Sequence, residues 1–317
     1  MPEKSKFSPA ELCQSIAQKK INLPYFTYIR SDRFQALNFM VDPIQGLRIS
    51  LLIEENIGKK FGYSSDNAIL SIFPHNNNPE ITGRLFKVFA LKGVMPEALA
   101  NSPSAISAVL KEEYIDKTSK ALFGPFSFSA YRTPDDWKLA QKGKEHLYKE
   151  VIASYQEQKP KVYALDYHND QELLQLRMDN RSITHIGAAF NELARIGLNL
   201  IFSATGSLLD KEGEILAFSL PASRDRSHMG IIKDLAPDTY RKNIYPVAVF
   251  SMNGPHFGDR YGIVSELLTA FDKDKIDLLG LSCTIASITG VVPASQLNSS
   301  ILTIKECFEV PSVIKKN

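Results

Sequence analysis

The chain has 317 residues, 44% of them hydrophobic and 23% charged, with 37 basic and 35 acidic residues. This composition excludes a fibrous or disordered protein, and the length is sufficient for about two domains. The formal net charge is only +2 and the basic residues are scattered, so we expect neither nucleic acid nor a membrane as a partner.

The sequence pattern of residues 1–131 predicts an alternation of short helices and strands. Ser8, Pro9 and Glu11 have the spacing of an N-cap, a first helical residue and a capping box, so we expect a helix over 8–20. The stretch 47–61 fits either a strand or a short helix. The other elements expected here are strands at 25–29, 36–41, 68–73, 105–110 and 126–131, and helices at 79–91 and 114–123.

From 132 to 160 the sequence becomes polar and charged, with apolar residues at helical intervals and Pro160 at its end. This pattern predicts a helix that connects two domains. The second half, 161–317, is expected to contain helices at 182–195, 261–271 and 295–308, and strands at 162–165, 173–178, 199–204, 214–220, 247–251, 277–282 and 286–292. Between them, Arg224, Asp225, Arg226 and His228 are interpreted as a solvated surface.

Two sequence patterns occur once in each half, which indicates an internal repeat. Ile21-Asn22-Leu23 and Leu198-Asn199-Leu200 each follow a helix, and Pro74-His75 and Pro255-His256 each follow a strand. Because Asn is favoured at left-handed helix exits, we expect Asn22 and Asn199 to take that conformation, with ligand contact as the alternative.

Over 247–308 the expected order is strand, helix, strand, strand, helix, which is five of the six elements of a ferredoxin-like βαββαβ unit. The predicted fold class is therefore α+β. We expect ferredoxin-like units in tandem, with antiparallel sheets that carry helices on one face.

The loop before the helix at 261–271 is the candidate binding site. Gly254 and Gly258 permit positive φ and close approach of a ligand to the backbone. The N-terminus of the helix offers free N–H groups and partial positive charge, which suits a carboxylate. Asp259 can bind an ammonium group or cap the helix, so a zwitterionic amino acid fits this loop. The corresponding loop at 74–80 has no glycine and no Asp-Arg pair, which favours a structural role.

Residues 247–308 resemble an ACT domain, a small-molecule-binding module attached to many enzymes of amino-acid metabolism. The resemblance rests on the Asp-Arg-x-Gly-apolar motif at 259–263 and on the strand after Ile276-Asp277. The Leu198-Asn199-Leu200 and Ser287-Ile288-Thr289 patterns are also similar to the regulatory region of aspartate kinases. This similarity implies four ACT-like units, with one tandem over 1–131, a connecting helix over 132–160 and a second tandem over 161–317.

The resemblance implies an amino-acid ligand whose carboxylate lies on the amides of 253–260 and whose side chain contacts the strand 277–282. We further expect a homodimer whose sheets join side by side, and a partner enzyme of amino-acid metabolism. The expected ligand-binding residues are Met252, Asn253, Gly254, Pro255, His256, Phe257, Gly258, Asp259, Arg260, Gly262, Asp277 and Leu278.

The sequence offers little support for catalysis. No Ser or Cys nucleophile motif accompanies His75 or His256, and the histidines lack metal-ligand spacing. We therefore expect no catalytic residue, cofactor or metal, and a regulatory protein that is not an enzyme. Two alternatives stay open, namely an enzyme that uses the ferredoxin-like sheet as a platform and an oligomerisation scaffold without a ligand.

The cysteines and the N-terminus indicate the compartment. Cys13, Cys283 and Cys307 form no even disulfide framework and no C-x-x-C spacing, which favours a reducing compartment and burial as small hydrophobic residues. Residues 1–7 lack an apolar core, and no run reaches the roughly 18 apolar residues of a membrane span. A cytoplasmic protein is expected.

Overall fold

The computed structural model describes residues 8–31, 34–57, 61–141, 159–207, 213–222, 227–255, 257, 260–284 and 287–316. The elements up to residue 141 are α1 (Pro9–Gln18), β1 (Tyr25–Arg30), β2 (Gln35–Met40), α2 (Gly46–Ile57), β3 (Asn67–Ile72), α3 (Pro79–Lys92), β4 (Ala98–Asn101), β5 (Ile106–Lys111), α4 (Glu112–Leu122) and α5 (Pro134–Gln141). Those after residue 159 are β6 (Ala164–Met178), α7 (Ile183–Arg195), β7 (Ser203–Ser207), β8 (Glu214–Pro221), α8 (Ser227–Leu235), β9 (Tyr240–Asn253), α9 (Ile263–Lys273), β10 (Gly280–Cys283), β11 (Ser287–Pro293), α10 (Leu297–Cys307) and β12 (Val313–Lys315).

The same order of elements occurs twice. The series α1-β1-β2-α2-β3-α3-β4-β5-α4 and the series α7-β7-β8-α8-β9-α9-β10-β11-α10 match element by element. The additional elements are α5, β6 and β12, with short 3-10 turns between some of the others.

Local sequence explains where the first helices form. Ser8 Oγ accepts a hydrogen bond from the Glu11 amide and Pro9 takes the first helical position, so α1 begins as predicted. The ambiguous stretch at 47–61 contains a helix, α2. Its buried residues Ile49, Leu52 and Ile53 recur at helical spacing and pack against α1.

One sheet unites the described chain. Its twelve strands follow the order β2-β1-β10-β11-β9-β6-β8-β7-β4-β5-β3, and β12 pairs with β6. All strand pairs are antiparallel except that of β6 with β12. The expected α+β fold with antiparallel strands is therefore confirmed. The sequence predicted two strands at 162–165 and 173–178, whereas β6 is continuous, with register shifts against β9.

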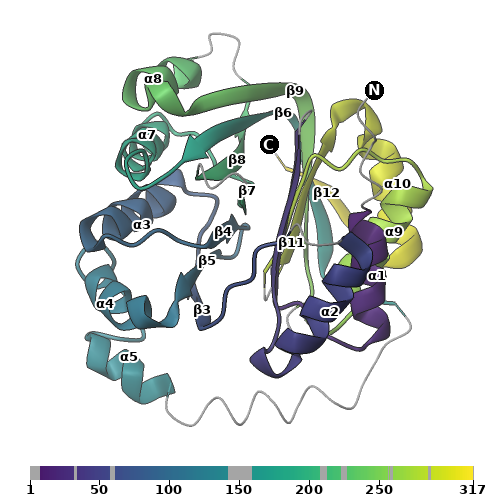
Figure 1. Ribbon diagram of the computed structural model, residues 1–317. Coiled ribbons are helices and arrows are strands. Elements are labelled where there is room, and N and C mark those ends of the chain that lie inside the picture. The colour runs from purple at the N-terminus through teal and green to yellow at the C-terminus, as the bar shows by residue number, and fades with distance from the viewer. Residues whose placement is uncertain are drawn as a thin grey trace.

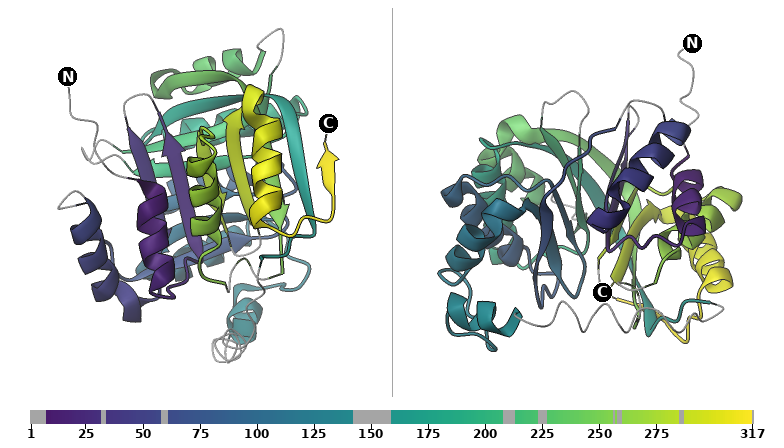
Figure 2. Two further views of the ribbon diagram at one scale, coloured as in Figure 1. Left: turned by 90° about the vertical axis from the view of Figure 1, so that its right-hand side faces the viewer. Right: turned by 60° about the horizontal axis from the view of Figure 1, so that its bottom comes forward.

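The sheet forms two layers, each covered by helices on its outer face. Helices α8, α7, α3 and α4 cover one side, and α2, α1, α9 and α10 cover the other (Figures 1 and 2). The inner faces pack against each other through a cluster that includes Ile29 on β1, Phe202, Ala217 on β8 and Val291 on β11. Strands buried on both faces lack the alternation of a half-exposed strand, which explains the continuous apolar runs in β5 and β8.

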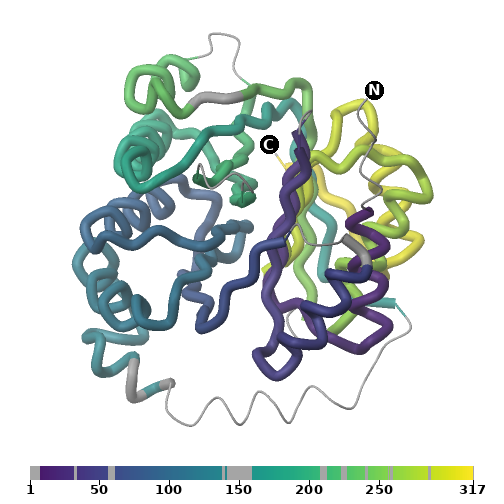
Figure 3. Tube along the Cα trace, in the orientation of Figure 1, coloured from purple at the N-terminus to yellow at the C-terminus, as the bar shows by residue number. Residues whose placement is uncertain are grey.

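Segments far apart in the sequence lie side by side. Strand β1 pairs with β10, where Phe26 is opposite Cys283. Helix α1 lies next to α9 in the views of Figures 2 and 3. On the other side, β4 meets β7 at Ala100 and Ala204, and α3 lies next to α7. The segments 1–131 and 161–317 are thus interleaved, so each side of the molecule contains residues from both.

Two sequence-predicted elements differ in the structure or lie outside the described residues. Residues 126–131 form no strand. The rings of Phe126 and Phe128 pack with each other there, and that of Phe128 also packs against Phe123. The helix expected over 132–160 is described only as α5, and residues 142–158 lie outside the described residues. No helix in the described ranges has the length and apolar character needed to cross a membrane.

Candidate functional site

A cavity lies where the end of α1 meets the start of α9. The free space between its walls is about 380 Å³ when open solvent is included, and the centre of a water-sized sphere can occupy about 20 Å³ of it. One wall comes from α1 and the segment after it, and the opposite wall from the loop before α9 and the ends of β10 and β11. The lining residues are Cys13, Ile16, Ala17, Ile21, Asn22, Leu23, Phe257, Arg260, Gly262, Ile263, Val264, Ser265, Cys283, Thr284 and Ile288. The site therefore combines the apolar-Asn-apolar motif of the first half with the loop of the second.

The N-terminus of α9 opens into this cavity without a side-chain cap. Gly262 holds the N-cap position at φ 90°, a conformation that favours glycine, and as a glycine it has no side chain that could cap the helix. Among the described residues no other side chain bonds to the amides that follow. The first amide engaged within the helix is that of Glu266, which donates to the Gly262 carbonyl at 2.8 Å. The amides of Ile263, Val264 and Ser265 have no partner among the described residues. They provide donors and partial positive charge for an anionic group.

Arg260 adds a full positive charge beside these amides. Its side chain is 13% exposed, and Nη2 donates to Glu266 Oε1 at 3.1 Å. Within the described residues Nη1 is buried and has no hydrogen-bond partner. Burial raises the pKa of Glu266, and the nearby Arg260 opposes that rise. Because an unpaired buried guanidinium donor is costly, the site is suited to a ligand that supplies an oxygen acceptor.

The thiols in the lining are protonated and apolar in character. Burial raises the pKa of Cys13 to about 12 and raises that of Cys283 further above its usual range, with Cys13 adding to the effect. Since the thiolate is the nucleophilic form of cysteine, both residues serve here as hydrophobic wall. No group of three or more His, Cys, Asp or Glu side chains suited to a metal is present in the described part of the chain.

The structure brings only some of the sequence-predicted site residues to the cavity. Phe257, Arg260 and Gly262 line it. His256, Gly258 and Asp259 lie outside the described residues. The others point elsewhere or lie at a distance along the chain: Met252, Asn253, Gly254, Pro255, Asp277 and Leu278.

Each of these remaining residues has another environment. Met252 and Leu278 are buried in the apolar core on this side of the sheet. Gly254 is confined, since a Cβ would lie 2.6 Å from the Lys161 carbonyl oxygen. Asp277 forms an exposed ion pair with Arg30 at 2.7 Å. The carbonyl of Asn253 accepts from the Tyr163 amide at 2.8 Å, and Pro255 is exposed.

Two interpretations of polar residues were wrong. The left-handed residues at the helix exits are Lys20, at φ 57°, and Gly197, at φ 78°, rather than Asn22 and Asn199. The ring of His228 is fully buried in contact with the Glu172 carboxylate, instead of belonging to a solvated surface, and Asn243 Nδ2 donates to the same carboxylate at 2.5 Å. Arg224, Asp225 and Arg226 lie outside the described residues.

The fold is similar to that of a solved aspartate kinase. The aspartate kinase from Synechocystis matches 95% of this chain with a TM-score of 0.74 and 16% identity, and the match covers 51% of that chain. The ligand-free regulatory subunit of aspartate kinase from Thermus thermophilus matches 46% of this chain and 98% of its own, with 13% identity and a TM-score of 0.40. No protein-family model matches the chain, and no curated protein does either.

The first comparison confirms the expected resemblance at the level of the fold and corrects another expectation. The protein was expected not to be an enzyme, but a solved structure that matches 95% of this chain is an enzyme, an aspartate kinase. The expectation was based on the lack of nucleophile and metal motifs in the sequence. The lack of such motifs gives no information on whether the fold is shared with an enzyme. The chain spans about half the length of that enzyme.

Proposed function

We propose that this chain forms a regulatory, small-molecule-binding part of an enzyme of the aspartate-kinase type, and that the cavity between α1 and α9 is its ligand site. The repeated order of elements supports an internal repeat of ACT-like units. The observation that carries the proposal is that two groups lie side by side: the N-terminus of α9, which no described side chain caps, and the buried Nη1 of Arg260, which has no hydrogen-bond partner among the described residues. Both favour a carboxylate, and the apolar lining favours a small organic ligand.

The ligand class that we infer is an amino acid. Its carboxylate would bind the amides of 263–265 and Arg260, and its side chain would contact the wall formed by Ile16, Ile21 and Ile288. Because the two walls come from different parts of the chain, binding would stabilise the packing of α1 on α9. A ligand shifts a conformational equilibrium only through such differential contacts.

Isothermal titration of the proteinogenic amino acids tests this function. We expect saturable heat for one or a few of them, and about 10- to 100-fold weaker binding for Arg260→Gln, because a hydrogen bond to a charged group is lost. Arg84→Gln is the matched control, since Arg84 lies near the N-terminus of α3 and away from the cavity. No saturable heat for any amino acid, or unchanged affinity in Arg260→Gln, would contradict the proposed site.

A second candidate function is catalysis by this chain itself on the ferredoxin-like sheet, which is favoured by the match to an enzyme chain. It is tested by measuring nucleotide turnover with the purified chain and aspartate, without any other protein. Turnover that co-purifies with the chain through successive columns would support this candidate. Turnover that separates from the chain would contradict it.

A further inference from the structure

The outer face of α2 carries an apolar surface that the fold does not use. Ile44, Leu47 and Leu51 are 82%, 78% and 54% exposed, and Tyr63 is 65% exposed. Leu47 and Leu51 have the i, i+4 spacing of one face of α2, and Ile44 lies three residues before Leu47 in the 3-10 turn Pro43–Gln45 that leads into the helix. Tyr63 lies over the start of α2, because a Cβ on Gly46 would be 3.2 Å from its hydroxyl. Ile44, Leu47 and Leu51 form one surface, which we call the α2 stripe, and Tyr63 lies beside the start of the helix.

The stripe is opposite the face by which α2 joins the core. Ile49, Leu52 and Ile53 are at most 7% exposed and pack against Leu12 and Ile16 of α1. Helix α2 is also the last in its row, beyond α1, α9 and α10, so no described element covers its outer side (Figure 2). The helix is therefore anchored by one apolar face and presents a second one outward.

The helix at the corresponding place in the other layer has no such surface. In α8, Met229 and Ile232 are buried, whereas Gly230, Lys233 and Asp234 occupy exposed positions. This position in the fold can thus be closed by a helix with a polar outer face. The leucines of the α2 stripe need an explanation outside the packing of a single chain, since contiguous exposed apolar surface marks an interaction site.

Two opposite charges beside the stripe are placed so that each can pair with the other one in a second copy of the chain. Arg48 and Glu55 are exposed, and being seven residues apart they lie on the same flank of α2. Neither has an ion-pair partner among the described residues. When two copies of a helix pack antiparallel around a two-fold axis, equal flanks meet with their directions reversed. Arg48 of each copy then approaches Glu55 of the other, while the leucines meet between them.

We propose that two copies of this chain associate through the α2 stripe as an antiparallel helix pair related by two-fold symmetry. This pairing continues the helix row α10-α9-α1-α2 into the second copy. It is independent of ligand binding at the cavity, which is on the far side of α1 from the stripe.

Sedimentation analysis of the full chain tests the pairing. We expect the wild type to have twice the 35.4 kDa mass of one chain. The double variant L47E/L51E should associate at least about 100-fold more weakly, because it places charges in the contact. Leu302→Glu is the control, because Leu302 is a 65% exposed leucine on α10, and it should leave the dimer intact. A monomeric wild type, or a dimeric L47E/L51E variant, would overturn the proposal.

A charge exchange tests the antiparallel geometry and identifies a second copy as the partner. Arg48→Glu alone and Glu55→Arg alone should each weaken self-association, since like charges then meet across the two-fold axis. A mixture of the two variants should form a heterodimer of wild-type strength, because both contacts again join opposite charges. Failure of the mixture to associate more tightly than either variant alone would refute the arrangement.

Discussion

The two places where a helix exit meets a strand-to-helix loop differ in what fills them. At the first, Ile21-Asn22-Leu23 meets the loop before α9, and a cavity remains. At the second, Leu198-Asn199-Leu200 meets the loop before α3, and the chain closes the junction itself. The Leu200 amide donates to the Asn77 carbonyl at 2.7 Å, and Asn101 Nδ2 donates to the Leu200 carbonyl at 2.9 Å.

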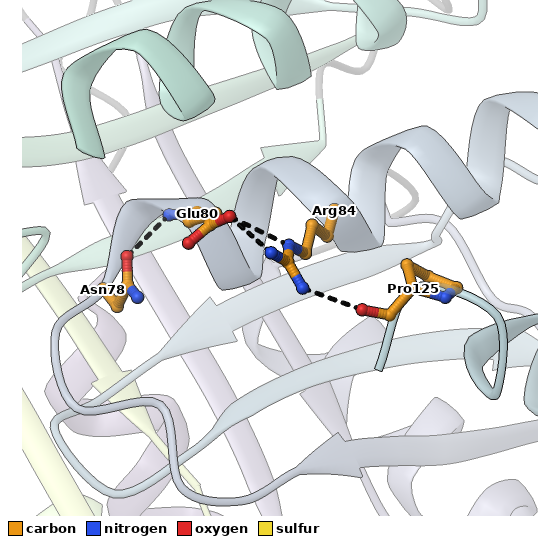
Figure 4. A network of polar contacts seen from close by, with 4 residues as sticks. All are labelled: Asn78, Glu80, Arg84 and Pro125. Atoms are coloured by element: carbon orange, nitrogen blue, oxygen red, sulfur yellow. Dashed lines mark hydrogen bonds and ion pairs between the residues drawn. The ribbon is translucent and has the colours of Figure 1, made fainter. Parts of the chain in front are cut away.

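The helix N-termini at the two junctions show the same contrast. Asn78 caps α3 by accepting from the Glu80 amide at 2.9 Å, and Glu80 pairs with Arg84, which also donates to the Pro125 carbonyl (Figure 4). Gly262 cannot cap α9 with a side chain, and no other side chain in the described ranges does so. Where the protein supplies its own acceptors there is no role for a ligand carboxylate. We therefore expect a ligand at the junction of α1 and α9, where the amides of 263–265 have no partner among the described residues.

The largest effect that would test this comparison is expected from pH. His75 is fully buried at the closed junction, with Nε2 3.2 Å from Thr82 Oγ1 and Nδ1 3.4 Å from Asn101 Nδ2, and burial lowers its pKa from 6.5 to about 4. The folded state therefore binds fewer protons than the unfolded state between pH 6.5 and 4. Stability attributable to neutral His75 is present above pH 6.5 and is lost as the pH falls towards 4.

Urea unfolding at pH 7 and pH 4.5 measures this loss. The wild type should lose roughly 2–3 kcal/mol more than His75→Gln over this interval, since one pKa unit corresponds to about 1.4 kcal/mol. His185→Gln, at an exposed position on α7, should lose as much as the wild type. Equal losses in the wild type and His75→Gln would mean that the junction tolerates a charged imidazole and is not closed to solvent.

A second effect is expected from the helix pair at the closed junction. Gly83 on α3 lies so close to α7 that an added Cβ would be 2.7 Å from the Gly187 carbonyl oxygen. Gly83→Ala should lower the free energy of unfolding by about 2 kcal/mol through overpacking. Gly230→Ala on α8 has no atom within 4 Å of the new Cβ, and should instead stabilise the protein by about 0.5–1 kcal/mol. If Gly83→Ala were equally stabilising, the two helices would not be in close contact.

The sequence predicts the parts of the site but not their meeting. Local patterns place Ile21-Asn22-Leu23 after a helix and Arg260 before one. Their approach depends on β1 pairing with β10, a contact between distant segments on which helical or strand periodicity carries no information. The loop glycine Gly254 was assigned to a ligand because positive φ and close approach were expected, whereas it is confined by Lys161 and Phe257 of the chain itself.

The burial of His228 was missed for a related reason. Its neighbours in the sequence are charged, so a solvated surface is the natural interpretation of 224–228. The partner that accounts for its burial, Glu172, is on β6 and is 4% exposed. A buried His–carboxylate contact requires both residues to be brought together by the sheet, and neither residue signals the other by spacing.

The smallest effect concerns the cap that distinguishes α3 from α9. Asn78→Ala removes the acceptor for the Glu80 amide, and should lower the free energy of unfolding by about 1 kcal/mol. Glu80→Gln, which weakens only the exposed pair with Arg84, should cost less than about 0.5 kcal/mol. Both free energies of unfolding are measured by urea unfolding at pH 7.

If Asn78→Ala cost no more than Glu80→Gln, water would accept hydrogen bonds from the α3 amides as well as the Asn78 side chain does. An uncapped α9 N-terminus would then give a ligand carboxylate no advantage over water, and the contrast between the junctions would rest on the cavity and Arg260 alone.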